Sequence, residues 1–489
     1  MRGTAIPFAL ALLAVAAADG FGQAGSKPVD IEAIRKAETA LIGLIERSET
    51  AVVAVLVEPA APEEAPKTAG PGDFFRDLKG VSQPGGRRDE ADVAGTGIVI
   101  DREGSVLTLY VAVRPGSRHY VAAVDGKTYP AKLVAADPRS GLAVLKPEVK
   151  GDAGLPYLEL GEAERLRKGR QLLLIGNAEA ILNDGQPTAS LGMVTNFAIK
   201  PGGQANLNNT PDDTRRSFRT TLHHYGTLIQ TDARVGWSSP GGALVDLSGR
   251  LVGVATTLSS AAGHEEPARY AIPINKAMRR IVGLLKEGKE VEYGLLGIAF
   301  PVESAVSTRR LPGIEAQVAF PGGPASQAGL RARDLITHVA DVPVTSADTL
   351  QLEIGMRAPG TATPVRFLRD GRPQLVSVTL AKQHPMKGQV VTAEPRSWQG
   401  LVVDYATALP RDELEAATAI GAIDRGGCVV VRSVEEGSVA WESGARPGKF
   451  ITHVGSRRVR SPGDFWQAVN SQESPGLRFT SEKSEPAFP

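Results

Sequence analysis

The chain opens with a helical pattern that is followed by a strand-like run. Apolar side chains recur at helical spacing after Val29, at Ile31, Ile34, Ala37, Leu41, Leu44 and Ile45. This spacing predicts an amphipathic helix over residues 29–50. The uninterrupted apolar run from Ala51 to Val57 predicts a buried strand. Residues 58–93 are rich in Pro, Gly and charge, and this composition predicts a long mobile loop.

From Gly95 to Pro273 short β-rich runs alternate with turns. About a dozen such runs follow one another with no helical pattern between them, which is typical of β-barrels or β-sandwiches. From Ile274 the pattern changes to that of a helix, which leads into a charged linker. We therefore expect one β-rich domain over residues 51–288, closed by a helix.

The last third of the chain repeats itself. Residues 321–339 and 435–454 share a Gly, small residues and the sequence ITHV, and the two histidines, His338 and His453, are 115 positions apart. A constant offset over such a stretch predicts two duplicated modules. We place these modules at residues 289–384 and 398–489, joined by a linker over residues 385–397.

Composition limits the classes of partner. A length of 489 residues predicts about three domains. A formal net charge of +1 gives no reason to expect nucleic acid or an anionic membrane as partner. The single cysteine, Cys428, excludes an internal disulfide, and its apolar neighbours predict a buried strand residue. Because neither His338 nor His453 has further ligands at metal spacing, no metal and no cofactor is expected.

The N-terminus has the pattern of an export signal. One Arg precedes an apolar run from Ala5 to Ala18, with the small residues Ala16 and Ala18 before Asp19. This pattern predicts a signal peptide over residues 1–18 and a periplasmic or cell-envelope location. An uncleaved anchor is the alternative, although the run is shorter than the roughly 20 residues that span a bilayer.

Motifs in the β-rich region resemble those of the HtrA/Deg family of trypsin-like serine proteases. The family's nucleophile segment resembles residues 228–257, where Asp232 precedes Gly241 by nine positions. Further motifs occur in family order: GTGIVID (95–101), GSVLT (104–108), DPRSGLAVLK (137–146), LLIGN (173–177), SLGMV (190–194) and YAIP (270–273). The resemblance implies a mainly β fold, a trypsin-like double six-stranded β-barrel followed by two PDZ-like α+β modules. It also implies a homo-oligomer, a trimer by analogy.

The same resemblance implies that the catalytic triad is degenerate. The positions of the family's His, Asp and Ser carry Val111, Gly141 and Pro240, and an oxyanion-loop Gly is replaced by Ser238. None of these side chains at the triad positions can attack a carbonyl or accept a proton. We therefore predict a pseudoenzyme of the serine endopeptidase class. The alternative is an endopeptidase with relocated catalytic residues, for which the neighbouring candidates are Ser238, Ser239, His119, His223 and His224.

A binding loop is expected where the first module begins. PDZ domains add an extended peptide to a sheet edge, beside a Gly-containing loop whose amides hold a carboxylate. The resemblance assigns this loop to Tyr293, Gly294, Leu295, Leu296, Gly297 and Ile298. In the second module Gly400 to Val403 is a weaker candidate, and the short sequence after its last helix predicts an incompletely closed module. Phe74 and Phe75 are either a docking element or a local apolar contact.

These expectations predict an exported, catalytically inactive HtrA-like protein that binds peptides or unfolded proteins as an adaptor, scaffold or holdase. An active protease paralogue is a further expected partner. A purely structural envelope protein remains the third alternative.

Overall fold

The computed structural model describes residues 30–58, 92–149, 154–199, 221–234, 240–256, 270–300, 313–471 and 476–480. The chain divides into two compact units. The second unit joins Val134–Gly141 and Leu207–Thr227 to everything from Arg280 onward, and the first unit contains the rest. The expected signal peptide, the aromatic residues Phe74 and Phe75, and the two serines Ser238 and Ser239 lie outside the described residues.

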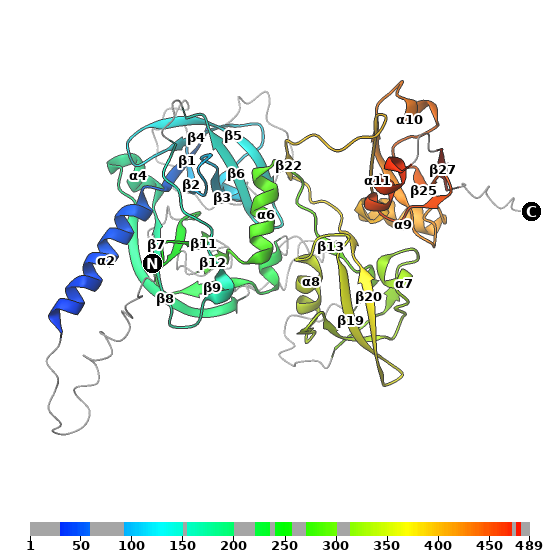
Figure 1. Cartoon of the computed structure of the whole chain (residues 1–489), viewed down its shortest axis with the longest axis horizontal. Helices are drawn as coiled ribbons and strands as arrows, with labels where there is room; N and C mark the ends of the chain where they lie inside the picture. Colours follow the sequence, from blue (N-terminus) through cyan, green and yellow to red (C-terminus); the bar gives the residue numbers. More distant parts are fainter. Residues whose placement is uncertain are drawn as a thin grey trace, which may run out of the picture. The chain divides into compact units, whose positions relative to one another are not determined.

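The first unit contains two six-stranded barrels (Figure 1). In the first barrel β5, β4, β1, β2, β3 and β6 are neighbours in that order, and β5 also pairs with β6. The central strand β1 is buried on both faces, which is why its sequence is a continuous apolar run. The bounds are β1 Val52–Glu58, β2 Asp92–Val99, β3 Val106–Leu109, β4 Arg118–Ala122, β5 Thr128–Asp137 and β6 Leu142–Pro147.

The second barrel is closed in the order β10, β11, β12, β9, β8 and β7. Its core contains Leu172, Leu174, Val194, Ile229 and Leu244. The bounds are β7 Gln171–Gly176, β8 Thr188–Ile199, β9 Leu228–Thr231, β10 Ala243–Asp246, β11 Leu251–Thr256 and β12 Tyr270–Pro273. The predicted mainly β fold with two six-stranded barrels is therefore confirmed.

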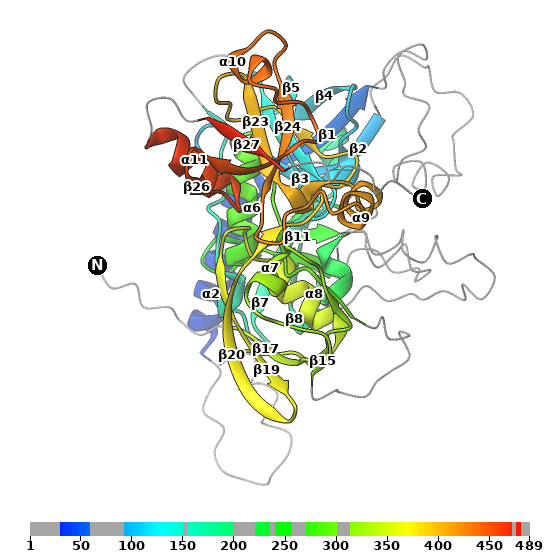
Figure 2. The same cartoon turned by 90° about the vertical axis from the view of Figure 1, so that its right-hand side faces the viewer.

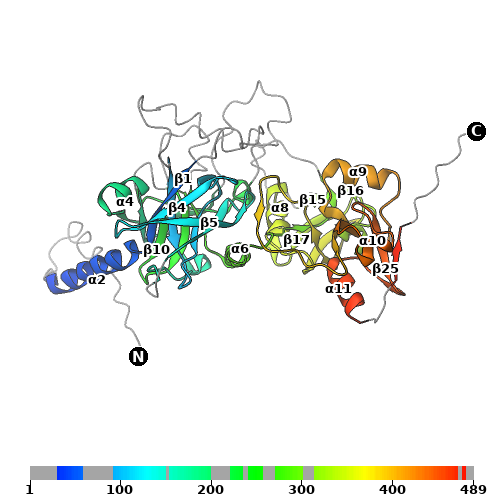
Figure 3. The same ribbon diagram turned by 90° about the horizontal axis from the view of Figure 1, so that it is seen from above.

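Short helices accompany the barrels. Helix α2, Ile31–Glu49, begins at Asp30, whose carboxylate accepts the N–H of Ala33 at 3.1 Å (Figure 3). Helix α6 follows the last barrel strand and comprises Lys276–Lys286. Helix α4, Ala178–Asp184, was not expected; it begins at the capping residue Asn177 and ends at Gly185 in a left-handed conformation. The 3₁₀ turns η1, Tyr110–Ala112, and η2, Ala163–Arg165, complete this part.

The first module of the second unit is built on the sheet order β15, β17, β19, β20, with β18 paired to β17. The long hairpin of β19 and β20 is seen in Figure 2. Helix α8, Ala347–Gly355, covers the module's core with Leu350 and Ile354. The remaining bounds are β13 Gly294–Leu295, β14 Ile298–Ala299, β15 Ile314–Glu315, β16 Val318–Ala319, α7 Pro324–Gln327, β17 Leu335–Val339, β18 Val342–Pro343, β19 Ala362–Arg369, β20 Arg372–Thr379 and β21 Ala381–Lys382. Strand β22, Val390–Val391, follows the module and pairs with β5.

The second module repeats this order of elements. Strands β23, β24, β25 and β26 are neighbours, and β27 pairs with β25. In the first module the counterpart of β27, strand β19, is followed by β20, whereas residues 481–489 lie outside the described part. The bounds are β23 Leu401–Tyr405, η5 Ala406–Ala408, α9 Arg411–Ala419, β24 Val429–Val434, α10 Val439–Glu442, β25 Phe450–Val454, β26 Arg457–Arg458, α11 Pro462–Asn470 and β27 Leu477–Phe479.

Candidate functional site

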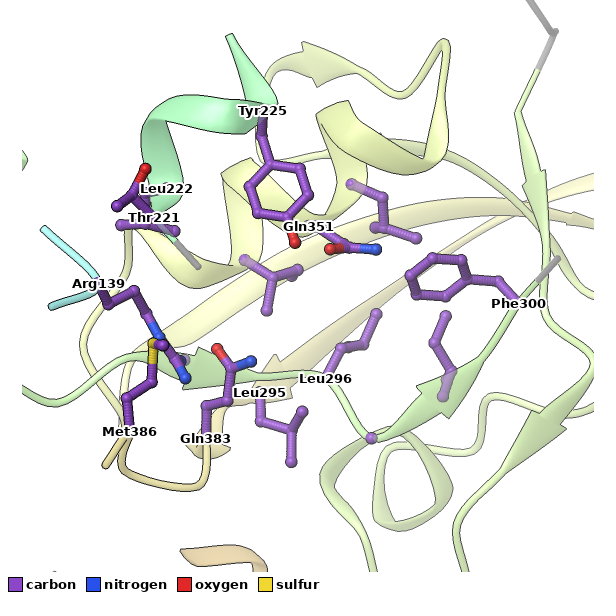
Figure 4. Close-up of a pocket in the computed structure, with 15 residues that line it drawn as sticks. Arg139, Thr221, Leu222, Tyr225, Leu295, Leu296, Phe300, Gln351, Gln383 and Met386 are labelled. Carbon is purple, nitrogen blue, oxygen red and sulfur yellow. The ribbon is translucent and has the colours of Figure 1, made fainter. Parts of the chain in front are cut away.

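A cavity of about 370 Å³ lies in the first module, between its opening loop and helix α8 (Figure 4). This volume is within the range of small-molecule and peptide side-chain pockets, about 300–1,000 Å³. The lining is mostly apolar. Its residues are Arg139, Thr221, Leu222, Tyr225, Gly294, Leu295, Leu296, Gly297, Ile298, Phe300, Leu350, Gln351, Ile354, Gln383 and Met386.

The predicted loop provides one wall of this cavity, from Gly294 to Ile298. Two of its carbonyl groups are held from behind: Leu296 O accepts the N–H of Ala325, and Gly297 O accepts the N–H of Phe320, both at 3.0 Å. The N–H groups of Leu296 and Gly297 have no hydrogen-bond acceptor within the described part of the chain. Two consecutive free amides beside an apolar pocket fit a carboxylate.

Steric contacts explain why two positions of the loop are glycines. Gly297 has a φ of 75°, and a Cβ there would lie 3.0 Å from Pro324 Cδ. A Cβ on Gly294 would lie 2.6 Å from Ile354 O, the backbone of helix α8. A Gly297→Val replacement would therefore strain the turn itself, and it cannot serve as a clean test of carboxylate binding.

Tyr293 lies behind the loop, outside the cavity lining. Its hydroxyl donates to the carboxylate of Asp137, and its ring lies beneath the guanidinium of Arg139, 4.9 Å from Cζ to the centroid. Burial raises the pKa of Tyr293 well above its usual value and also raises the pKa of Asp137. Tyr293 therefore supports the site from inside the module.

Four lining residues, among them Thr221, come from segments far from the module in sequence. Arg139 follows strand β5, and Leu222 and Tyr225 belong to η3, Leu222–Tyr225, which lies against α8. Leu222 N donates to Arg139 O at 2.9 Å, which joins the two segments. Sequence analysis missed all four, because no local pattern indicates that these segments meet the module.

The three predicted triad positions have backbone roles in the structure. Val111 lies in η1 with 41% of its surface exposed. Gly141 has a φ of 68° and closes a turn by donating to Asp137 O at 3.0 Å. Pro240 O accepts the N–H of Thr96 at 2.9 Å. A Cβ on the next residue, Gly241, would lie 2.0 Å from Thr96 O, so the close approach of strand β2 requires a glycine there.

The histidines considered as relocated bases are partly or fully buried. His119 Nε2 accepts the N–H of Arg114 at 3.2 Å, and burial lowers its pKa. His223 Nε2 donates to Ser140 O at 2.8 Å, and its Nδ1 lies 2.6 Å from Thr227 Oγ1. His224 Nδ1 lies 2.9 Å from Thr221 Oγ1 within a capping box. The Thr227–His223 contact places a hydroxyl beside an imidazole, although Thr227 does not line the cavity.

The second module has a similar loop with different side chains. Gly400 has a φ of 82°, and its carbonyl accepts the N–H of Glu435 at 2.9 Å, as Gly297 accepts from Phe320. Trp398 precedes this turn, and its ring meets Phe465 of helix α11 edge to face at 5.9 Å. Phe465 is fully buried. Phe465 and Trp398 therefore pack together at the position of Leu350, while Trp466 lines a separate cavity of about 350 Å³.

A buried cation lies where the two modules meet. Lys382, whose side chain is 2% exposed, contacts Asp404 at 2.7 Å, Glu290 at 2.8 Å and Glu292 at 3.2 Å. Arg432 also reaches Glu290, at 2.7 Å. Burial acts against the charge, but the three carboxylates outweigh it and raise the pKa of Lys382. This cluster was not predicted, because its members lie in segments distant in sequence.

Family comparisons agree with this architecture. Residues 95–254 match the trypsin-like peptidase domain, and residues 294–380 match the PDZ domain. A protein of Ectopseudomonas mendocina named "Probable periplasmic serine endoprotease DegP-like" is 31% identical over 90% of both chains. A protein of Chlamydia trachomatis with the same name is 29% identical over 78% of this chain and 70% of its own length. The solved HtrA-type protease AlgW with a decapeptide is 23% identical and covers 71% of this chain and 99% of its own, with a TM-score of 0.48.

The chain thus combines a trypsin-like peptidase domain with a PDZ domain. It belongs to the HtrA family of DegP-like periplasmic serine endoproteases. This confirms the predicted family and the export to the periplasm or cell envelope. Among the described residues, no helix is long and apolar enough to cross a membrane.

The comparisons contradict one prediction. The chain was expected not to be an enzyme, but its relatives are named serine endoproteases. The physical reason is that the expectation rested on three aligned positions, Val111, Gly141 and Pro240. A change at these positions does not exclude hydroxyl and imidazole groups elsewhere in the chain.

Proposed function

We propose that this periplasmic HtrA-family protein captures extended peptides or unfolded proteins in the cavity of its first PDZ module, as an adaptor or holdase. The observation that carries the proposal is the pairing of two free amides, those of Leu296 and Gly297, with a mostly apolar cavity of about 370 Å³. An extended ligand would continue the sheet edge at β14, and its last side chain would enter the cavity.

The test is fluorescence polarisation of the full chain with fluorescein-labelled decapeptides that end in Val, Leu, Ile or Phe. Saturable binding is expected. Gln351→Trp should abolish it, because Gln351 lines the cavity and lies half-buried on the surface of α8. The matched control is Leu352→Trp, next along the helix and outside the lining. A wild-type chain that binds none of the peptides would contradict the proposal.

Peptide hydrolysis is a second candidate, favoured by the names of the relatives. It requires a nucleophile and a base away from Val111, Gly141 and Pro240. Hydroxyls to test are those of Ser238, Ser239 and Thr227. The measurement is fluorophosphonate labelling together with release of fluorescence from labelled casein. Loss of both signals in one of Ser238→Ala, Ser239→Ala or Thr227→Val identifies the nucleophile, and absence of both signals in the wild type contradicts this candidate.

The assembly of the chain stays a prediction. A homo-oligomer, a trimer by analogy, and association with an active protease paralogue are both consistent with membership of the family. Sedimentation of the purified chain and co-purification from envelope extract would test them separately.

A further inference from the structure

We propose that Arg139, which lies outside the PDZ module in sequence, binds the C-terminal carboxylate of the captured peptide and so selects free chain ends. The inference rests on the proposed function of the cavity. It adds a specificity-determining residue from a segment that the module itself does not contain.

Arg139 is nearly buried and incompletely satisfied. Only 9% of its surface is exposed, yet it lines the cavity. Its Nη2 donates to His384 O at 3.1 Å, whereas Nη1 has no hydrogen-bond partner among the residues that the structure describes. A buried donor without an acceptor is costly. Because Nη1 has less than 1 Å² of accessible surface, a ligand carboxylate would satisfy it after a small shift of the guanidinium toward the cavity that the side chain lines.

The carboxylate of Asp137 does not accept a hydrogen bond from Arg139 Nη1. The nearby carboxylate of Asp137 is engaged through Oδ2 by the hydroxyl of Tyr293 and by the N–H of Ser140. Of the cavity-lining residues that the structure describes, Arg139 is the one with a charged side chain. An anionic ligand group that enters the cavity therefore finds its complement at this residue.

The position of Arg139 is fixed before any ligand arrives. Its backbone carbonyl accepts the N–H of Leu222, and the next carbonyl, that of Ser140, accepts from the buried His223. The guanidinium rests on the ring of Tyr293. A side chain held in this way loses little conformational freedom on binding, which favours affinity.

The cavity also orients the peptide. Figure 4 places Arg139, Gln383 and Met386 at one end and Phe300 at the other. Strand β14 begins just after the loop and leads toward Phe300, so a peptide added along it would have its C-terminus at the Arg139 end. Apolar residues between the ends, including Leu296, Leu350 and Ile354, fit an apolar last side chain.

The experiment compares two forms of each decapeptide on the full chain, one with a free C-terminal carboxylate and one with a C-terminal amide. We expect the free acid to bind the wild type about ten-fold or more tightly than the amide, as is usual for a charge-assisted hydrogen bond. Arg139→Gln should remove this preference by weakening the acid alone. Arg139→Lys, which keeps the charge, should retain part of it.

The outcomes separate the inference from the function on which it rests. If the wild type binds acid and amide equally and Gln351→Trp abolishes both, the cavity binds peptides but Arg139 does not select carboxylates. If Arg139→Gln weakens both forms equally, Arg139 has only a structural role and the inference is overturned. If neither form binds the wild type, the proposed function fails together with the inference. The amides of Leu296 and Gly297 would also favour the free acid in the wild type, so the assignment to Arg139 is decided by the variants. An unchanged acid preference in a folded Arg139→Gln variant overturns the inference, and Arg139→Lys provides the second reading if Arg139→Gln does not fold.

Discussion

The two C-terminal modules have the same arrangement of strands around helices α8 and α11, but different side chains lie beside these two helices. The offset of 115 residues relates α8 to α11, β17 to β25 and the start of β19 to the start of β27. Under this offset Leu350 and Gln351 correspond to Phe465 and Trp466. The first pair lines the mostly apolar cavity, whereas Phe465 is buried against Trp398 and Trp466 lines a second cavity of about 350 Å³ that contains charged residues.

This difference shows how one fold can keep or lose a binding site without changing its hydrogen-bonded frame. Gly297 and Gly400 both have a positive φ, and their carbonyls accept the N–H of the residue that follows the paired strand, Phe320 after β16 and Glu435 after β24. The second module also borders a cavity, of about 350 Å³, and the charge of the lining distinguishes it from the first: it contains Lys382, Arg432 and Asp404, whereas the first is mostly apolar. We therefore expect the first module to bind a peptide with an apolar last residue and the second to bind it more weakly.

The largest expected effect on stability comes from the buried ion-pair cluster between the two modules. Lys382→Ala should lower the free energy of unfolding by about 3 kcal/mol, because it removes the buried cation shared by Asp404, Glu290 and Glu292 and leaves only the half-exposed Arg432 to pair with the first two. Urea denaturation followed by tryptophan fluorescence would measure the loss. Lys387→Ala, at an exposed position of the same linker region, is the control. Equal stability of the two variants would contradict the role given to the cluster.

Acid should reduce the folding stability of the first module more than that of the second. Burial lowers the pKa of His223 to about 4, whereas an unfolded histidine titrates near 6.5. The unfolded chain then binds more protons between these values, so stability is present above about pH 6.5 and is lost, by about 3 kcal/mol, as the pH falls to about 4.

The measurement is hydrogen exchange of peptides from α8 and α11, corrected for the intrinsic pH dependence. Helix α8 lies against η3, which carries His223. Exchange in α8 should therefore increase between pH 6.5 and 4 relative to α11, and His223→Gln should reduce that difference. A pH-independent ratio of the two rates would contradict the prediction.

Placing an aromatic ring at Leu350, the position that Phe465 has in the second module, should weaken peptide binding and reduce folding stability. Leu350→Phe should reduce peptide affinity about ten-fold or more, and overpacking should cost about 1–3 kcal/mol of folding stability. Polarisation and urea denaturation would measure the two effects. Unchanged affinity in a folded variant would show that the cavity beside Leu350 does not receive the ligand.

The reverse change should have the smallest effect. Phe465→Leu removes an aromatic contact with Trp398 and with Trp466 and should destabilise the second module by about 1–2 kcal/mol. The change in urea midpoint, read by tryptophan fluorescence, would measure it. A stabilised variant would show that the aromatic packing in this groove is not favourable.

The alternation of β runs with turns predicted a β-rich domain, and the family resemblance supplied the two barrels. The resemblance also pointed to Gly294–Ile298, which line the cavity, and their role in binding stays a prediction. Sequence analysis failed for features that depend on distant segments meeting. Arg139, Leu222 and the partners of Lys382 gave no local signal. Tyr293 was assigned to the binding loop, where its sequence neighbours lie, but its ring is turned into the interior. The prediction of a non-enzyme failed because triad positions alone do not report on side chains elsewhere.

The most direct test of the account is to find where a bound peptide lies on the chain. A decapeptide with a free C-terminus and a benzophenone group near that end would be photo-crosslinked to the full chain, and the attachment sites would be identified by mass spectrometry. The account predicts cross-links at the cavity, in residues 294–300 and in helix α8. Cross-links concentrated instead in β23 and α11 of the second module, or no specific cross-link at all, would contradict it.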